Sequence, residues 1–247
     1  ISRNESIAKS KRIKIENNKI KGSISLEGAI IDDISFKNYK KNIEEDEIIS
    51  FLNPKDTTNG YFIESGWTSI GNNIDVPTNK SIWTAVGNNM LSTNSPVLLE
   101  WQNKNGLIFK KKIELDEKYL FKISQVVENN TNSEINLYPY AQITRNKIPD
   151  DIQNFYISHE GFIGVFDEEL KEDDYDDIEE KKIVREASNG WLGITDKYWM
   201  TAIVPEQGKN FKSTFLYKEA FKANYILNTP TSIKPSSYNS NNVRLFV

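Results

Sequence analysis

The side chains that could do chemistry in this chain are carboxylates and a single histidine. Acids are densest at Glu168-Glu169 and Asp173-Asp174, and paired carboxylates are what glycoside hydrolysis requires. These acids belong to a nearly all-charged run from 167 to 182, which could form a short helix, an extended edge or a solvated loop, and such a run is most often a solvated face. The run lacks the Asp-x-Asp-x-Asp-Gly spacing of a calcium loop, so it could bind Ca²⁺ only loosely. The acids therefore indicate neither a hydrolase pair nor a metal site.

His159 is the only histidine, and the chain has no cysteine. A general base needs a positioned partner, and the sequence around His159 offers none, so a structural role is the prediction. Without cysteine, disulfides, thiolate nucleophiles and zinc–thiolate sites are excluded. Glycine-rich phosphate loops and the G-x-S-x-G and H-E-x-x-H motifs are also absent from the sequence. We expect no enzyme activity, no catalytic residues, no metal and no cofactor.

The stretch from 189 to 205 concentrates large aromatic side chains. Trp191, Tyr198 and Trp199 fall within nine positions, next to glycines at 190 and 193 and before an apolar run. Each large ring buries roughly 150–250 Å², which makes such a cluster a usual organiser of a core. We predict that these three rings pack in the core and hold sheets together.

The elements around this stretch alternate between apolar and polar residues, which is typical of half-buried strands. The segments 97–115, 119–127 and 135–143 predict an antiparallel meander, with Asn105-Gly106 as a hairpin turn. A long loop is expected over 67–80. Turns recur about every 8–12 residues and no long helix is indicated. The fold class predicted is all-β, a large antiparallel sandwich with at most short helical segments.

No shift in composition divides the 247 residues, so one domain over 1–247 is predicted, with 1–10 as a flexible linker. The chain begins at Ile1 and ends in the apolar run Val243–Val247, which suggests a piece of a longer protein. The net charge of −4 argues against nucleic acid as a partner.

Several stretches together carry a resemblance to a known family. They are Arg12–Asn17, Lys21–Ile24, Gly28-Ala29, the hairpin 98–115, the strand 119–127 with Glu128-Asn129-Asn130, and Asn189–Gly193 leading through Asp196–Trp199 to Ala202–Pro205. In this order they resemble the large periplasmic domain of the YidC/Oxa1/Alb3 family of membrane protein insertases. The glycine–tryptophan signature is the most specific part.

The resemblance implies a β supersandwich similar to galactose mutarotase folds, on the periplasmic side of the bacterial inner membrane. It implies a non-catalytic scaffold or docking module whose partners are Sec translocon subunits and nascent inner-membrane proteins. Contact with the membrane would run through flanking helices that are absent from this sequence. The signature residues, expected to be structural, are Gly190, Trp191, Gly193, Asp196, Tyr198 and Trp199.

The alternative is a carbohydrate-binding β-sandwich module of mutarotase-like fold. Trp67, Trp83 and Trp101 could stack on sugar rings. Mutarotase-type enzymes are expected to use paired histidines with a carboxylate, and His159 alone does not supply a pair. Epimerase catalysis is therefore disfavoured, while sugar binding remains open.

Overall fold

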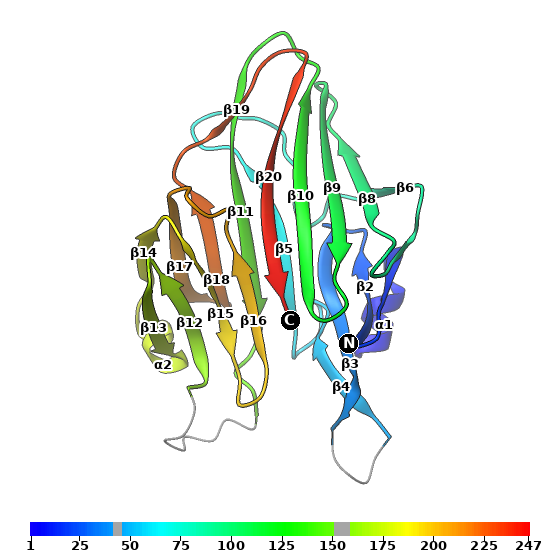
Figure 1. Ribbon diagram of the computed structural model, residues 1–247, viewed down its shortest axis with the longest axis vertical. Helices are drawn as coiled ribbons and strands as arrows, with labels where there is room; N and C mark the ends of the chain where they lie inside the picture. Colours follow the sequence, from blue (N-terminus) through cyan, green and yellow to red (C-terminus); the bar gives the residue numbers. More distant parts are fainter. Residues whose placement is uncertain (42–45, 151–158) are drawn as a thin grey trace.

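The chain folds into two large β-sheets that pack face to face, as seen in the computed structural model (Figure 1). The structure describes residues 1–41, 46–150 and 159–247. In those ranges the only helices are two of six residues each, and neither is long and apolar enough to cross a membrane. The predicted all-β sandwich with short helical segments is confirmed.

The first sheet has eleven strands and includes the beginning of the chain. Its spatial order is β14 (Ile183–Ala187), β17 (Phe211–Lys218), β18 (Ala220–Leu227), β11 (Ile135–Arg145), β5 (Tyr61–Thr68), β3 (Ile30–Lys40), β2 (Ile20–Ser25), β1 (Arg12–Glu16) and β7 (Met90–Leu91), with β19 (Thr231–Ile233) paired to β11 and β4 (Ile48–Leu52) paired to β3.

The second sheet has nine strands and includes the signature stretch. Its order is β13 (Glu169–Asp174), β12 (Gly161–Phe166), β15 (Gly190–Thr195), β16 (Met200–Val204), β20 (Ser237–Phe246), β10 (Leu120–Asn129), β9 (Leu107–Leu115), β8 (Val97–Gln102) and β6 (Thr84–Val86). Across the described strands the pairings are antiparallel, apart from β1 with β7.

The core lies between the sheets because alternate residues of each strand point inward. In β9, Phe109, Lys111 and Ile113 are buried while residues 110 and 112 are more exposed, and in β10 Phe121 and Ile123 are buried on either side of the exposed residue 122. This period-two burial is the pattern that the sequence alternation predicts.

The predicted meander is wrong at its last strand. β8, β9 and β10 are consecutive antiparallel neighbours, but β11 crosses to the other sheet, and β20 pairs with the free edge of β10. Asn129 anchors the crossing: its buried side-chain amide donates to the carbonyls of Ser133 at 2.8 Å and Ile233 at 2.9 Å. Alternation alone reports which face of β11 is apolar and leaves its sheet undetermined.

The first residues form helix α1 (Arg3–Ala8) where a flexible linker over 1–10 was expected. Ser2 and Glu5 make a capping box, in which Ser2 N donates to the Glu5 carboxylate at 2.8 Å. Arg3 forms an ion pair with Asp33 of β3, and Ser6 is buried. The helix is therefore fixed by a contact thirty positions away, which local polarity does not reveal.

Arg3→Met is expected to loosen α1 while the sandwich stays folded. The change leaves the buried Asp33 without its guanidinium partner, and methionine cannot replace that charge-assisted bond. Hydrogen exchange of the amides over 4–9 should become markedly faster. Lys9→Met is the matched control because its pair with Asp56 is exposed, at 3.7 Å; equal exchange in both variants would contradict this anchoring role.

The acidic run forms the edge strand β13 and the short helix α2 (Tyr175–Glu180), so the two structured alternatives describe it and the favoured solvated loop does not. β13 pairs with β12 at the end of the nine-stranded sheet. Tyr175 and Ile178 are buried, and the Tyr175 ring lies 4.9 Å from that of Phe221. Two apolar side chains spaced three apart thus dock an otherwise charged helix on the core.

Candidate functional site

The two signature glycines lie where the chain passes too close to a neighbouring strand for a side chain. A Cβ on Gly193 would fall 2.0 Å from the carbonyl oxygen of Thr201 on β16. A Cβ on Gly190 would fall 1.8 Å from the carbonyl oxygen of Val165, and Gly190 has a φ of +125°. Real Cβ atoms do not approach backbone that closely, so both positions require glycine for packing.

Asp196 begins the β15–β16 turn and joins the two sheets. Its backbone N–H donates to the Trp199 carbonyl at 2.7 Å, which closes the turn. Its carboxylate accepts from Arg145 Nη1 at 2.6 and 2.8 Å. Arg145 comes from the end of β11 in the other sheet, and its guanidinium lies 4.5 Å from the centre of the Tyr61 ring. The pair therefore ties the turn to the opposite layer.

Trp199 makes a second tie between the sheets. Its ring stacks on Phe36 of β3, with centroids 4.5 Å apart, and meets Tyr39 edge-on at 4.7 Å. Phe36 is 1 % exposed, while Trp199 is half-buried above it. Aromatic pairs in these geometries add about 0.5–1.5 kcal/mol beyond their buried area.

The core prediction does not hold for Tyr198, whose side chain is 73 % exposed. Tyr198 and Trp199 are adjacent in the turn and lie on opposite sides of it, so only one ring can face the core. The Lys197 ammonium lies 5.2 Å from the Tyr198 ring. Trp191, on β15, is half-buried. Of the three rings, Trp199 therefore faces the core residue Phe36, Trp191 is half-buried in β15, and Tyr198 faces solvent.

The sequence did not reveal which residues of the chain contact Asp196 and Trp199. Arg145 and Phe36 lie 51 and more than 160 positions away from Asp196 and Trp199, on strands of the other sheet. No local motif marks either partner, because their proximity arises from the stacking of the sheets.

His159 is held in a manner that suits a structural role. Its Nε2 lies 2.7 Å from the carbonyl oxygen of Phe162, and its Nδ1 lies 3.4 Å from the Asp174 carboxylate. Across residues 1–41, 46–150 and 159–247, no three His, Asp or Glu side chains converge in a way that could hold a metal ion.

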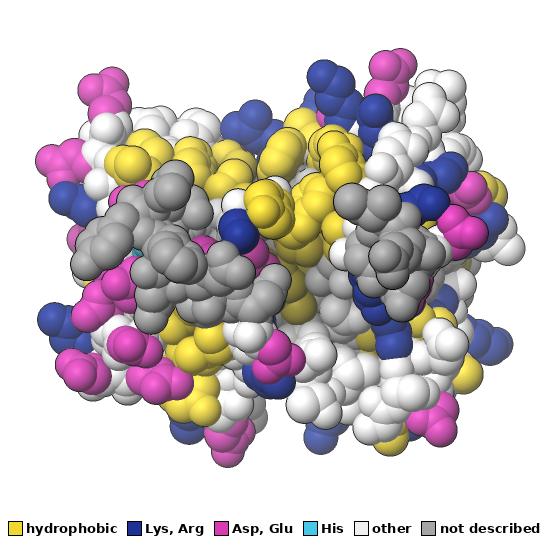
Figure 2. Space-filling model, turned by 90° about the horizontal axis from the view of Figure 1, so that it is seen from below, with side chains coloured by type: hydrophobic (Ala, Val, Ile, Leu, Met, Phe, Trp, Pro, Cys, Tyr) yellow, Lys and Arg dark blue, Asp and Glu magenta, His cyan; other side chains and the backbone are white. Residues whose placement is uncertain are grey.

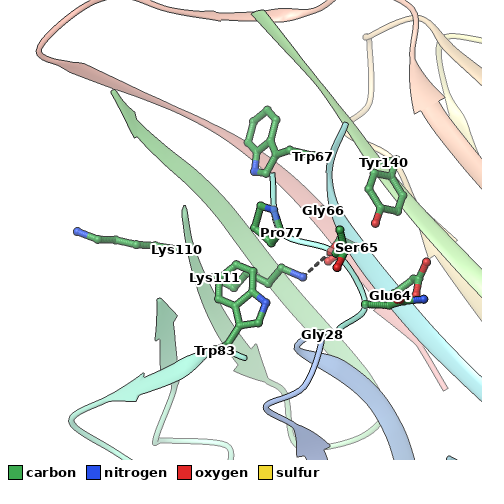
Figure 3. A pocket seen from close by; sticks show the side chains of 12 residues that line it. Gly28, Glu64, Ser65, Gly66, Trp67, Pro77, Trp83, Lys110, Lys111 and Tyr140 are labelled. Carbon is green, nitrogen blue, oxygen red and sulfur yellow. Dashed lines mark hydrogen bonds between the residues drawn. The ribbon is translucent and has the colours of Figure 1, made fainter. Parts of the chain in front are cut away.

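A second polar feature lies inside the sandwich, around Lys111 of β9 (Figure 3). Lys111 is 3 % exposed, its ammonium donates to the Ser65 carbonyl, and it lies 5.1 Å from the Trp83 ring centre. The nearby Glu64 carboxylate accepts from Gln142 Nε2 at 3.3 Å. The cavity beside them is about 10 Å³, which is space for roughly one water molecule.

Burial controls the protonation of this pair. It lowers the pKa of Lys111 to about 8, against the opposing effect of the Glu64 charge, and it raises the pKa of Glu64. A lysine with a lowered pKa can act as a nucleophile elsewhere. Here the enclosed cavity has no room for a substrate, so the Lys111 pocket is a buried polar contact within the fold.

The lowered pKa of Lys111 predicts that stability rises with pH from about 8 to about 9.5, below the range in which the buried tyrosines, whose pKa values are raised, act in the opposite sense. In that range the unfolded chain binds more protons than the folded chain, so raising the pH favours folding. Urea unfolding across this range should show the rise in the wild type and not in Lys111→Met. Lys112→Met is the control, because Lys112 is exposed and should keep the rise; a rise that persists in Lys111→Met would contradict the assignment.

The tryptophans considered for sugar stacking lie mainly inside the protein. Trp67 and Trp83 are each 3 % exposed, so their faces belong to the core. Trp101 is half-buried and packs against Phe109 at 5.7 Å between ring centres. These positions do not form an aromatic platform at the surface.

Two solved structures whose names relate them to galactose mutarotase share this arrangement of strands, although their sequences are very different. A galactose mutarotase related enzyme from Lactobacillus acidophilus superposes with a TM-score of 0.65, covering 96 % of this chain and 97 % of that one, at 11 % identity. A galactose mutarotase-like protein from Lactobacillus casei gives a TM-score of 0.58 at 12 % identity, with 96 % and 99 % covered. At these identities the likeness shows the fold alone.

The sequence comparisons identify the family. The model of the YidC periplasmic domain matches residues 12–247. The membrane protein insertase YidC of Pelagibacter ubique is 43 % identical over 247 residues, covering 100 % of this chain and 44 % of the relative. That of Rickettsia bellii is 39 % identical, covering 95 % and 43 %. The chain thus spans less than half the length of these curated relatives, and it belongs to the YidC periplasmic domain family.

Proposed function

We propose that this chain is a non-catalytic periplasmic module of a membrane protein insertase. It assists the insertion and folding of inner-membrane proteins as a scaffold or docking module, on the periplasmic side of the bacterial inner membrane. Its partners are Sec translocon subunits and nascent inner-membrane proteins. The observation that carries the proposal is the family match over 12–247, together with relatives named membrane protein insertase.

The contacts that the signature residues make support a scaffold role. Asp196 and Trp199 each bind a partner in the opposite sheet, and Gly193 allows two strands to approach closely. These contacts fix the relative position of the sheets and leave the outer faces available for docking. A rigid two-sheet body presents a preformed surface, which lowers the entropic cost of binding.

The outer face of the nine-stranded sheet offers a polar surface for a protein partner. A hollow of about 360 Å³ on this face is lined by side chains of β9, β10, β16 and β20, including Glu114, Lys122 and Arg244. Mixed charge of this kind suits a non-obligate interface, whose composition resembles the rest of a protein surface.

Site-specific photocrosslinking in the full-length, membrane-embedded protein tests the docking role. A photoreactive residue would replace Asn242 on the nine-stranded sheet or Lys212 on the eleven-stranded sheet, both exposed. We expect adducts with Sec translocon subunits or nascent membrane proteins from at least one face. The buried Phe109 is the control position and should give none. Absence of specific adducts from both faces would contradict a docking module.

A further inference from the structure

One end of the sandwich carries several exposed and half-exposed aromatic side chains. We call it the aromatic end surface; its members are Tyr39, Tyr119, Tyr198, Trp199 and Phe246. Figure 2 looks at this end of the molecule and shows hydrophobic side chains gathered near its centre. Tyr198, Tyr39 and Phe246 are 73 %, 44 % and 39 % exposed.

Four of the five rings are connected, directly or through the core residue Phe36, while Tyr198 follows Lys197 in the same turn as Trp199 and faces solvent. Trp199 lies 4.5 Å and Tyr119 lies 5.8 Å from the Phe36 ring, while Tyr39 meets Trp199 at 4.7 Å. Phe246 continues the group at 6.4 Å from Tyr119. The surface is thus a supported patch that spans both sheets, unlike the scattered single apolar residues that are normal on a protein.

The chemistry of the patch favours a lipid interface as its partner. Four of its five members are tyrosine or tryptophan, whose rings are apolar while their O–H or N–H groups need polar partners. Such residues are enriched at the headgroup level of membranes. Lys197, exposed beside the Tyr198 ring, adds a cation suited to anionic headgroups. A groove for an apolar peptide would be richer in aliphatic side chains and methionine.

The position of the C-terminal residue also favours a lipid interface as the partner. The last residue, Val247, donates its backbone N–H to the Tyr119 carbonyl at 3.2 Å, within the aromatic end surface. Both ends of the chain lie in the same half of the molecule (Figure 1). Any continuation of the chain past Val247 would leave from this surface. The chain spans only 44 % of the Pelagibacter membrane protein insertase that it matches.

We infer that the aromatic end surface rests on the headgroup region of a lipid bilayer. The contact is shallow, because Asp116 and Glu117 are exposed next to Tyr119 and their charges would be costly in the hydrocarbon layer. The inference rests on the proposed function in placing the module beside a membrane. It sets the orientation of the sandwich: the strands stand away from the bilayer and the opposite end points outward.

Tyr198 and Tyr238 allow a matched test, because they are 73 % and 72 % exposed. Tyr238 is the second residue of β20 and Phe246 is its last, so Tyr238 lies at the opposite end of that strand from the aromatic end surface (Figure 1). The chain has no cysteine, so Tyr198→Cys or Tyr238→Cys gives a unique labelling site for an environment-sensitive fluorophore. The labelled chain would be anchored through a polyhistidine tag after Val247 to vesicles of phosphatidylethanolamine and phosphatidylglycerol containing a nickel-chelating lipid.

We expect the label at 198 to brighten several-fold on vesicles and to be quenched by nitroxide-labelled lipids, while the label at 238 stays unchanged. Tyr39→Ser should weaken the response at 198 without lowering the melting temperature of the sandwich by more than a few degrees. Equal responses at both positions, no response at 198, or a response only to a detergent-solubilised apolar peptide would each overturn the inference. Crosslinking to Sec subunits is independent of these readouts, so failure here leaves the docking proposal standing.

Discussion

Gly193→Ala is expected to destabilise the sandwich by about 3 kcal/mol or more, at or beyond the upper end for overpacked cores. The new methyl group would lie 2.0 Å from the backbone oxygen of Thr201, and backbone in the middle of a sheet cannot rotate away as a side chain can. β15 also pairs with β12 on its other edge, so the displacement would strain two strand pairings.

Equilibrium unfolding in urea measures this effect, with Gly208→Ala as the control. Gly208 has a φ of +80°, and a Cβ added there would meet no atom within 4 Å. Alanine at 208 therefore costs only the free energy of holding a non-glycine residue at a positive φ. That cost is about 1 kcal/mol. A Gly193 variant as stable as the Gly208 variant would show that the close approach of the strands is not a structural requirement.

Trp199→Ala is expected to cost about 3 kcal/mol, near the low end for large aromatic truncations because the ring is only half-buried. The loss comes from the stacked contact with Phe36 and the edge contact with Tyr39, both on β3 of the other sheet. Trp199→Phe should recover most of the stability, since it keeps a ring on Phe36.

Tyr198→Ala is the matched control for this change because it alters the neighbouring position of the same turn. Its side chain is mainly in solvent, so the free energy of unfolding should change by about 0.5 kcal/mol or less. We therefore expect Trp199→Ala to lower the free energy of unfolding, and Tyr198→Ala to change the protein surface with little effect on stability. Equal losses of stability would contradict this division.

The strand content could be predicted from the sequence because burial follows alternation. The hairpin at Asn105-Gly106 joins β8 to β9, and Asn103 Oδ1 accepts from the N–H groups of Asn105 and Leu107 at 2.9 Å each. Gly106 adopts a φ of +97°, which explains the glycine in that turn. These features are local, and local rules are sufficient to find them.

The features that depend on topology could not be predicted from the residues. Alternation in 135–143 indicates a strand equally well in either sheet, and only the crossing at Asn129 assigns β11 to the eleven-stranded one. The Arg145–Asp196 and Arg3–Asp33 pairs form after distant segments are brought together. The aromatic stretch can be recognised in the sequence, but which of its rings faces solvent follows from the β15–β16 turn.

A double-mutant cycle between Phe36 and Trp199 tests most directly whether the aromatic stretch 189–205 holds the two sheets together. Phe36→Leu and Trp199→Leu would be measured singly and combined by equilibrium unfolding. We predict a coupling free energy of about 1 kcal/mol, because the rings stack at 4.5 Å and each single change removes the same contact. Additive effects would contradict the account and leave Trp199 as a surface residue whose role lies in partner binding.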